Sequence, residues 1–122
     1  MNADELEERT RKFALRILKL LDSLPNTFAA QHIGKQLFRA SSSVAANYRA
    51  ARRARSRREF LSKMSIVVEE ADESVFWIIM LIEGEIVKET LLSDLLQEGT
   101  EIMKIMSSSR KTTKRNTKSQ NR

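Results

Sequence analysis

The densest group of side chains that could do chemistry is acidic. Glu69, Glu70, Asp72 and Glu73 lie within five consecutive positions. Paired carboxylates serve in acid–base catalysis and bind hard cations. At helical spacing Glu69 and Asp72 share one face, whereas Glu70 and Glu73 share another. We favour ion pairing with arginines of the preceding helix over a catalytic or metal-binding role, because arginines are abundant just upstream.

Other catalytic patterns are missing from the sequence. A di-iron centre in a helical bundle needs a Glu-x-x-His motif on each of two helices, but His32 is the single histidine and Ala29 stands three positions before it. There is no cysteine to act as a nucleophile or a thiolate ligand. No glycine-rich phosphate loop or Gly-x-Ser-x-Gly motif occurs. We therefore expect no enzyme activity, no cofactor, no metal and no small-molecule substrate.

Basic residues are the second group, and their distribution is uneven. Residues 31–63 contain nine Lys or Arg and one acidic residue, whereas residues 64–106 contain two basic and ten acidic residues. Residues 107–122 contain six basic and no acidic residues. The candidate nucleic-acid-binding residues are Arg49, Arg52, Arg53, Arg55, Arg57, Arg58, Arg110, Lys111, Lys114 and Arg115.

Two interpretations of the arginine cluster at residues 49–58 stay open. Arginines can bind the phosphates of RNA or DNA and release counterions, and the same basic surface could instead bind a nucleic-acid enzyme. Alternatively, they can pair with carboxylates of the same or a neighbouring subunit, and the ten acids of residues 64–106 make this plausible. If the chain folds back at Ser56, Arg39 lies level with Glu73 and Ser42 with Glu70.

Hydrophobic spacing predicts an all-α chain with four helices, at about 4–23, 28–53, 57–83 and 89–106. Pro25 interrupts the pattern after the first helix. Ser56 and Glu59 form a capping box ahead of the third helix. That third helix is apolar on two sides, which indicates a central position or a subunit interface, and we expect Trp77 and Tyr48 to pack in the core or an interface.

Four helices with short connections predict an antiparallel up-down bundle over residues 1–106. A three-helix fold with a frayed fourth helix is the structural alternative. Residues 107–122 have no aliphatic or aromatic side chain, so we expect a disordered basic tail. The longest apolar run, residues 75–82, is too short to span a bilayer. With an acidic N-terminus and no cysteine, the chain is expected to be soluble and cytoplasmic.

The central segment resembles a known family. It contains the strings Ala-Asn-Tyr-Arg-Ala-Ala at 46–51 and Glu-Glu-Ala-Asp-Glu at 69–73, with Trp77 following. This resembles the bacterial four-helix-bundle proteins first noticed as reading frames within intervening sequences of large-subunit ribosomal RNA. The accessory variability protein of diversity-generating retroelements is a more distant relative. Where the broader family often has Pro and an acidic-Gly pair, this chain has Ala45 and Ala50-Ala51.

The resemblance implies a bundle that assembles as a homo-oligomeric ring, commonly a pentamer, without known catalytic activity. It also implies RNA or DNA binding for some members. Residues that match the family's pattern are Asn47, Arg49, Arg55, Ser56, Glu59, Phe60, Glu70, Glu73 and Trp77. Of these, Arg49 and Arg55 belong to the candidate nucleic-acid-binding residues above. The others, together with Arg39 and Tyr48, are our candidate structural or interface residues.

Overall fold

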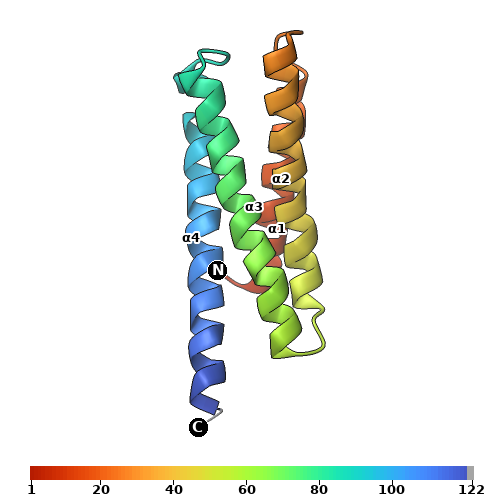
Figure 1. Cartoon of the computed structure of the whole chain (residues 1–122), viewed down its shortest axis with the longest axis vertical. Coiled ribbons are helices and arrows are strands. Elements are labelled where there is room, and N and C mark those ends of the chain that lie inside the picture. Colours follow the sequence, from red (N-terminus) through yellow and green to blue (C-terminus); the bar gives the residue numbers. More distant parts are fainter. Residues whose placement is uncertain (121–122) are drawn as a thin grey trace.

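Four helices make up the chain in the computed structural model, which describes the backbone of residues 1–120 and the side chains of residues 1–116. The helices are α1 (Ala3–Leu21), α2 (Phe28–Arg52), α3 (Arg57–Glu83) and α4 (Glu89–Gln120). Each runs antiparallel to the one before it (Figure 1). The predicted up-down four-helix bundle is therefore confirmed, and the three-helix alternative is wrong.

Side-chain caps set where three of the helices begin. The Asn2 Oδ1 atom accepts a hydrogen bond from the Glu5 amide at 2.8 Å, and the Thr27 hydroxyl accepts one from the Ala30 amide at 3.2 Å. The Ser56 hydroxyl accepts one from the Glu59 amide at 3.1 Å. The Glu59 carboxylate reaches back to the Arg55 amide, one residue before the cap. The predicted capping box thus starts α3, because it satisfies amides that lack a partner within the helix.

The predicted end of the fourth helix at Met106 is wrong. Helix α4 continues to Gln120, so the described part of the expected disordered tail is helical. Residues 107–116 contain no Gly or Pro, and the Thr113 hydroxyl bonds back to the Ser109 carbonyl at 3.0 Å. Lysines and arginines near a helix C-terminus also interact favourably with the helix dipole. Residues 121–122 of the predicted tail lie outside the described residues.

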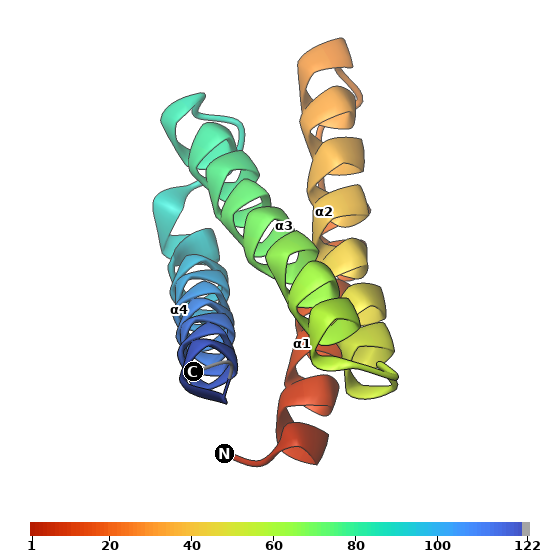
Figure 2. The same cartoon turned by 60° about the horizontal axis from the view of Figure 1, so that its bottom comes forward.

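Helix α3 lies between α2 and α4, and α1 packs mainly on α2 (Figures 1 and 2). The core runs along the bundle, and its largest fully buried side chains come from all four helices. They include Phe13, Ile17, Leu37, Val44, Met64, Val67, Ile78, Leu81, Leu92, Ile102 and Met106. Gly99 permits a close approach, because a Cβ there would lie 3.2 Å from the Phe13 ring and 3.3 Å from Val75.

The outer face of α3 exposes large apolar side chains. Ile66, Phe76, Ile79 and Met80 are between 37% and 51% exposed in the single chain. Trp77 is half-buried, with its ring edge-on to Phe76 and to His32 of α2. The prediction that this helix is apolar on two sides is confirmed, but only its inner side is covered within one chain.

Candidate nucleic-acid interface

The arginine cluster surrounds the turn between α2 and α3. Its six side chains, Arg49, Arg52, Arg53, Arg55, Arg57 and Arg58, are exposed. Helix α2 ends at Arg52 and α3 begins at Arg57, so a connection of four residues holds the cluster together. The cluster therefore forms one compact basic surface at an end of the bundle.

Arg52 pairs with acids that the sequence interpretation did not consider. Its guanidinium donates to Asp4 at 2.7 Å and to Glu7 at 3.2 Å, both on α1. The hydrogen bond to Asp4 raises the pKa of the Arg52 guanidinium above its ordinary value, and Glu7 adds to this shift. The interpretation that cluster arginines pair with carboxylates of the same subunit is confirmed for Arg52, but its partners are on α1 rather than on the third or fourth helix, because α1 lies beside the end of α2.

Arg49 and Arg53 form no ion pair with the described residues, and neither does Arg55. These three arginines line a pocket of about 500 Å³ together with Ala46, Ala50, Glu59 and Lys63. Glu59 is the one acid among the lining residues, and its carboxylate accepts a hydrogen bond from the Arg55 backbone. The pocket is therefore strongly positive.

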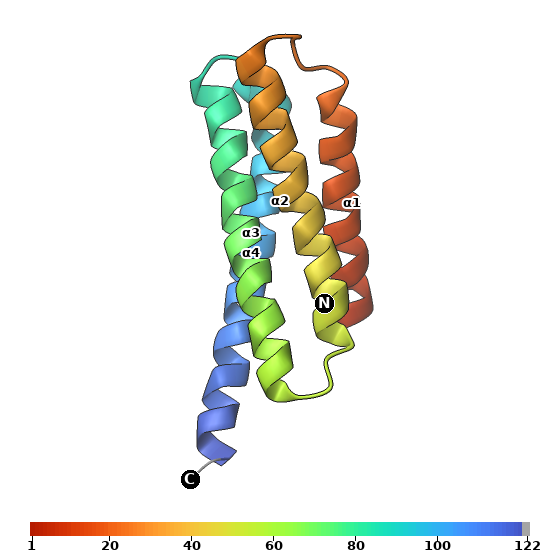
Figure 3. The same ribbon diagram turned by 45° about the vertical axis from the view of Figure 1, so that its right-hand side comes forward.

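The C-terminal part of α4 lies at the same end of the bundle as the α2–α3 connection (Figures 1 and 3). The last helical turns of α4 extend beyond that connection (Figures 1 and 3). Arg110, Lys111, Lys114 and Arg115 fall within an arc of roughly 140° at the normal helical repeat. Arg110 and Lys111 line a pocket with Glu69 and Asp72 of α3. The two predicted basic segments, separated by half the sequence, thus share one end of the molecule, which we call the basic end.

The four acidic residues at positions 69–73 lie in pairs on two faces of α3, as their helical spacing predicts. Glu70 and Glu73 face α2, where Arg39 donates to Glu70 at 2.8 Å and also binds Glu73. The level pairing of Arg39 with Glu73 is confirmed. Glu69 and Asp72 lie on the other face, beside α4. No group of three or more residues able to hold a metal ion occurs in the part of the chain that the structure describes.

The remaining predicted residues have structural surroundings. Tyr48 is buried in the core, and Phe60 at the start of α3 is partly buried against the core. Asn47 donates to the Ser43 carbonyl and hydroxyl, both at 2.9 Å, so it is satisfied within α2. Burial raises the pKa of Tyr48 above its ordinary value. These residues support the helices that carry the arginines.

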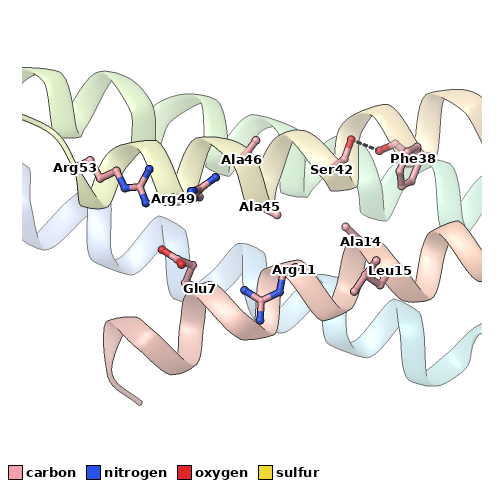
Figure 4. Close-up of a pocket in the computed structure, with 10 residues that line it drawn as sticks. All are labelled: Glu7, Arg11, Ala14, Leu15, Phe38, Ser42, Ala45, Ala46, Arg49 and Arg53. Carbon is pink, nitrogen blue, oxygen red and sulfur yellow. Dashed lines mark hydrogen bonds between the residues drawn. The ribbon is translucent and has the colours of Figure 1, made fainter.

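Sequence reasoning missed a groove between α1 and α2. Its walls are mainly Ala14, Leu15, Phe38, Ser42, Ala45 and Ala46, with Glu7, Arg11, Arg49 and Arg53 towards one end (Figure 4). Its volume is about 550 Å³. The sequence signal for this groove is the small side chains Ser42, Ala45 and Ala46 in the middle of α2.

The chain is similar to known proteins over most of its length. The family model described as 23S rRNA-intervening sequence protein matches residues 5–108. This chain belongs to the 23S rRNA-intervening sequence protein family. The match confirms the resemblance that rests on residues 46–51 and 69–73. It ends at residue 108, before Arg110, the first of the candidate nucleic-acid-binding residues on α4.

One solved structure supports the assignment to the 23S rRNA-intervening sequence proteins. It is a protein with unknown function from the S23 ribosomal protein family of Bacteroides thetaiotaomicron VPI-5482, with 32% sequence identity and a TM-score of 0.83. The alignment covers 91% of this chain and 99% of that one. No curated protein matches. Among the described residues, no helix has the length and apolar character needed to span a membrane.

Proposed function

We propose that this chain is a non-catalytic, cytoplasmic, oligomeric bundle that binds RNA or DNA through its basic end. One observation carries the proposal: the α2–α3 turn and the end of α4 place ten Lys and Arg side chains at one end of the molecule. Arg49, Arg53 and Arg55 have no ion pair with the described residues, so their charge is available to an external anion. Nucleic-acid phosphates are the common polyanion with which such a surface would pair.

Local acids reduce this charge only in part. Arg52 is paired with Asp4 and Glu7, and Glu69 and Asp72 lie beside Arg110 and Lys111. Lys114 and Arg115 are exposed on the part of α4 beyond that pocket. We therefore expect the turn arginines and the last described turns of α4 to contribute most to affinity.

A salt-dependent binding assay tests the proposal. Fluorescence anisotropy with labelled RNA and DNA should show binding at about 50 mM salt that weakens by about 10³-fold or more at 200 mM, as expected for six or more phosphate contacts. The variant Arg49→Gln/Arg53→Gln/Arg55→Gln should lose at least about tenfold in affinity, and Lys114→Gln/Arg115→Gln somewhat less.

The matched control is Arg16→Gln/Lys19→Gln, because both residues are exposed on α1 towards the opposite end. It removes the same charge as the α4 double variant and should leave affinity within about twofold. The proposal is wrong if the intact chain binds neither RNA nor DNA at low salt, or if the control weakens binding as much as the turn variant does.

A second candidate function is a purely structural oligomer whose arginine cluster forms salt bridges between subunits. The exposed apolar face of α3 favours self-association, because Phe76, Ile79 and Met80 lie together on one chain's surface. We propose a ring, with five copies as the working number from the family resemblance. In the structural alternative, the turn arginines would be neutralised by acids of the next copy.

A further inference from the structure

The groove between α1 and α2 is apolar along most of its length. Ala14 and Leu15 form one wall, and Phe38, Ala45 and Ala46 form the other (Figure 4). It exists because α2 has Ser42, Ala45 and Ala46 where larger side chains would fill the space between the helices. Its volume of about 550 Å³ lies within the range of sites that hold small ligands or single nucleotides.

The groove opens onto the positive pocket of the basic end. Ala46, Arg49 and Arg53 line both cavities, so the two adjoin along one side of α2. Arg11 adds a cation from α1. Glu7 is the single acid among the residues that line the groove, and it already accepts a hydrogen bond from Arg52. An apolar concavity thus continues directly into a pocket lined by Arg49, Arg53 and Arg55, which form no ion pair with the described residues.

We infer that this groove receives an unpaired base of single-stranded nucleic acid, while Arg49, Arg53 and Arg55 bind the adjoining phosphates. The inference rests on the proposed function and specifies its site. A base has an apolar face that suits the walls formed by Leu15 and Phe38, and guanidinium groups match phosphate oxygens geometrically. A base within a duplex is stacked on both faces and cannot enter the groove.

Filling the groove without changing its charge tests this inference. Ala45 is partly exposed and lines the groove but not the positive pocket, so Ala45→Leu should obstruct the groove and leave the phosphate-binding arginines in place. Ala29→Leu is the matched control, because Ala29 is exposed on the first turn of α2 and does not line the groove. The probes are a labelled single strand of about 12 nucleotides and a hairpin duplex with the same number of phosphates.

We expect Ala45→Leu to weaken single-strand binding about tenfold and to leave duplex binding within about twofold, whereas Ala29→Leu changes neither. Equal binding of the single strand by Ala45→Leu and the intact chain would overturn the groove assignment. If Arg49→Gln/Arg53→Gln/Arg55→Gln still weakened binding in that case, the proposed function would stand. Absence of binding by the intact chain would overturn both.

Photocrosslinking of the intact chain gives an independent readout that needs no variant. A single strand that contains 5-bromouracil should form adducts with Leu15 and Phe38 of the groove walls, which lie in the tryptic peptides 13–16 and 36–39. Adducts confined to residues 49–63 or 107–116 would mean that only phosphates are bound, and would overturn the inference.

Discussion

Tyr48 packs in the core, and its ionisation also makes the stability of the fold depend on pH. It lies one position before Arg49 and is 7% exposed, so its ring anchors the end of α2 from which the arginines extend. Burial raises the pKa of its hydroxyl, because the charged phenolate is less stable away from water. Arg52 opposes this shift, and Glu7 reinforces it.

This raised pKa predicts that alkaline pH weakens the fold. In the unfolded chain Tyr48 loses its proton near pH 10, while in the folded chain it holds the proton to a higher pH. Its stabilising contribution is therefore complete below about pH 10 and is lost as the pH rises through the folded pKa, by at most about 1.4 kcal/mol per pH unit. Urea unfolding at about pH 8 and pH 11 measures this.

Tyr48→Phe is the matched comparison, because it keeps the ring and removes the proton. We expect the variant to lose less unfolding free energy between the two pH values than the intact chain does. Equal losses in both chains would show that deprotonation of other groups, such as the lysines, accounts for the whole effect.

At the scale of elements, α4 differs most from its prediction. Among its described side chains the last fully buried one is Met106, yet the helix continues to Gln120. Hydrophobic periodicity ends where the core ends, so it could not detect a helix whose outer turns are polar. The Arg9 guanidinium, which binds Glu98 and Glu101, links α1 to the packed part of α4, and these hydrogen bonds raise the pKa of Arg9.

Truncation after Met106 tests the two parts of α4 separately. We expect the helical ellipticity per molecule to fall, because residues 107–120 are removed from a helix. The unfolding free energy should change by less than about 0.5 kcal/mol, since no fully buried apolar side chain is lost. Circular dichroism during urea unfolding measures both quantities.

A variant with Gln at 110, 111, 114 and 115 serves as the control, because it keeps the length of the chain and removes the four charges. It should retain the ellipticity that truncation loses. Identical ellipticity per molecule in the truncated and intact chains would contradict a helical continuation of α4.

At the scale of the whole molecule, the structure separates two surfaces. The basic end contains the clustered Lys and Arg residues, whereas the outer face of α3 exposes Ile66, Phe76 and Ile79. Self-association through α3 would leave the basic end available to nucleic acid. If the turn arginines instead formed salt bridges between subunits, the basic end would be buried in the interface. The two candidate functions therefore predict different oligomer interfaces.

Light scattering distinguishes these interfaces. One chain has a mass of 14.0 kDa, so a five-membered ring would weigh about 70 kDa. We expect Phe76→Asp to reduce the mass towards that of a single chain, because a charge would be buried in an apolar contact. Arg55→Glu should leave the mass unchanged. A lower mass for Arg55→Glu, with Phe76→Asp unaffected, would favour the structural alternative.

The sequence by itself determined the helices, their order and several of their contacts. Hydrophobic spacing located the packed parts of all four helices, and Ser56 with Glu59 located the start of α3. The register about Ser56 predicted the pairing of Arg39 with Glu73. These features depend on residues close in sequence or related by a single turn, so local spacing is sufficient to infer them.

Only the tertiary structure decided which distant residues share a surface. It paired Arg52 with Asp4 and Glu7 across 45 or more positions, and it formed a groove from α1 and α2. It also placed the arginines of the turn and the end of α4 at one end of the bundle. The physical reason is that the packing of antiparallel helices sets these neighbours, and hydrophobic spacing within one helix does not indicate which helices distant in sequence pack beside it.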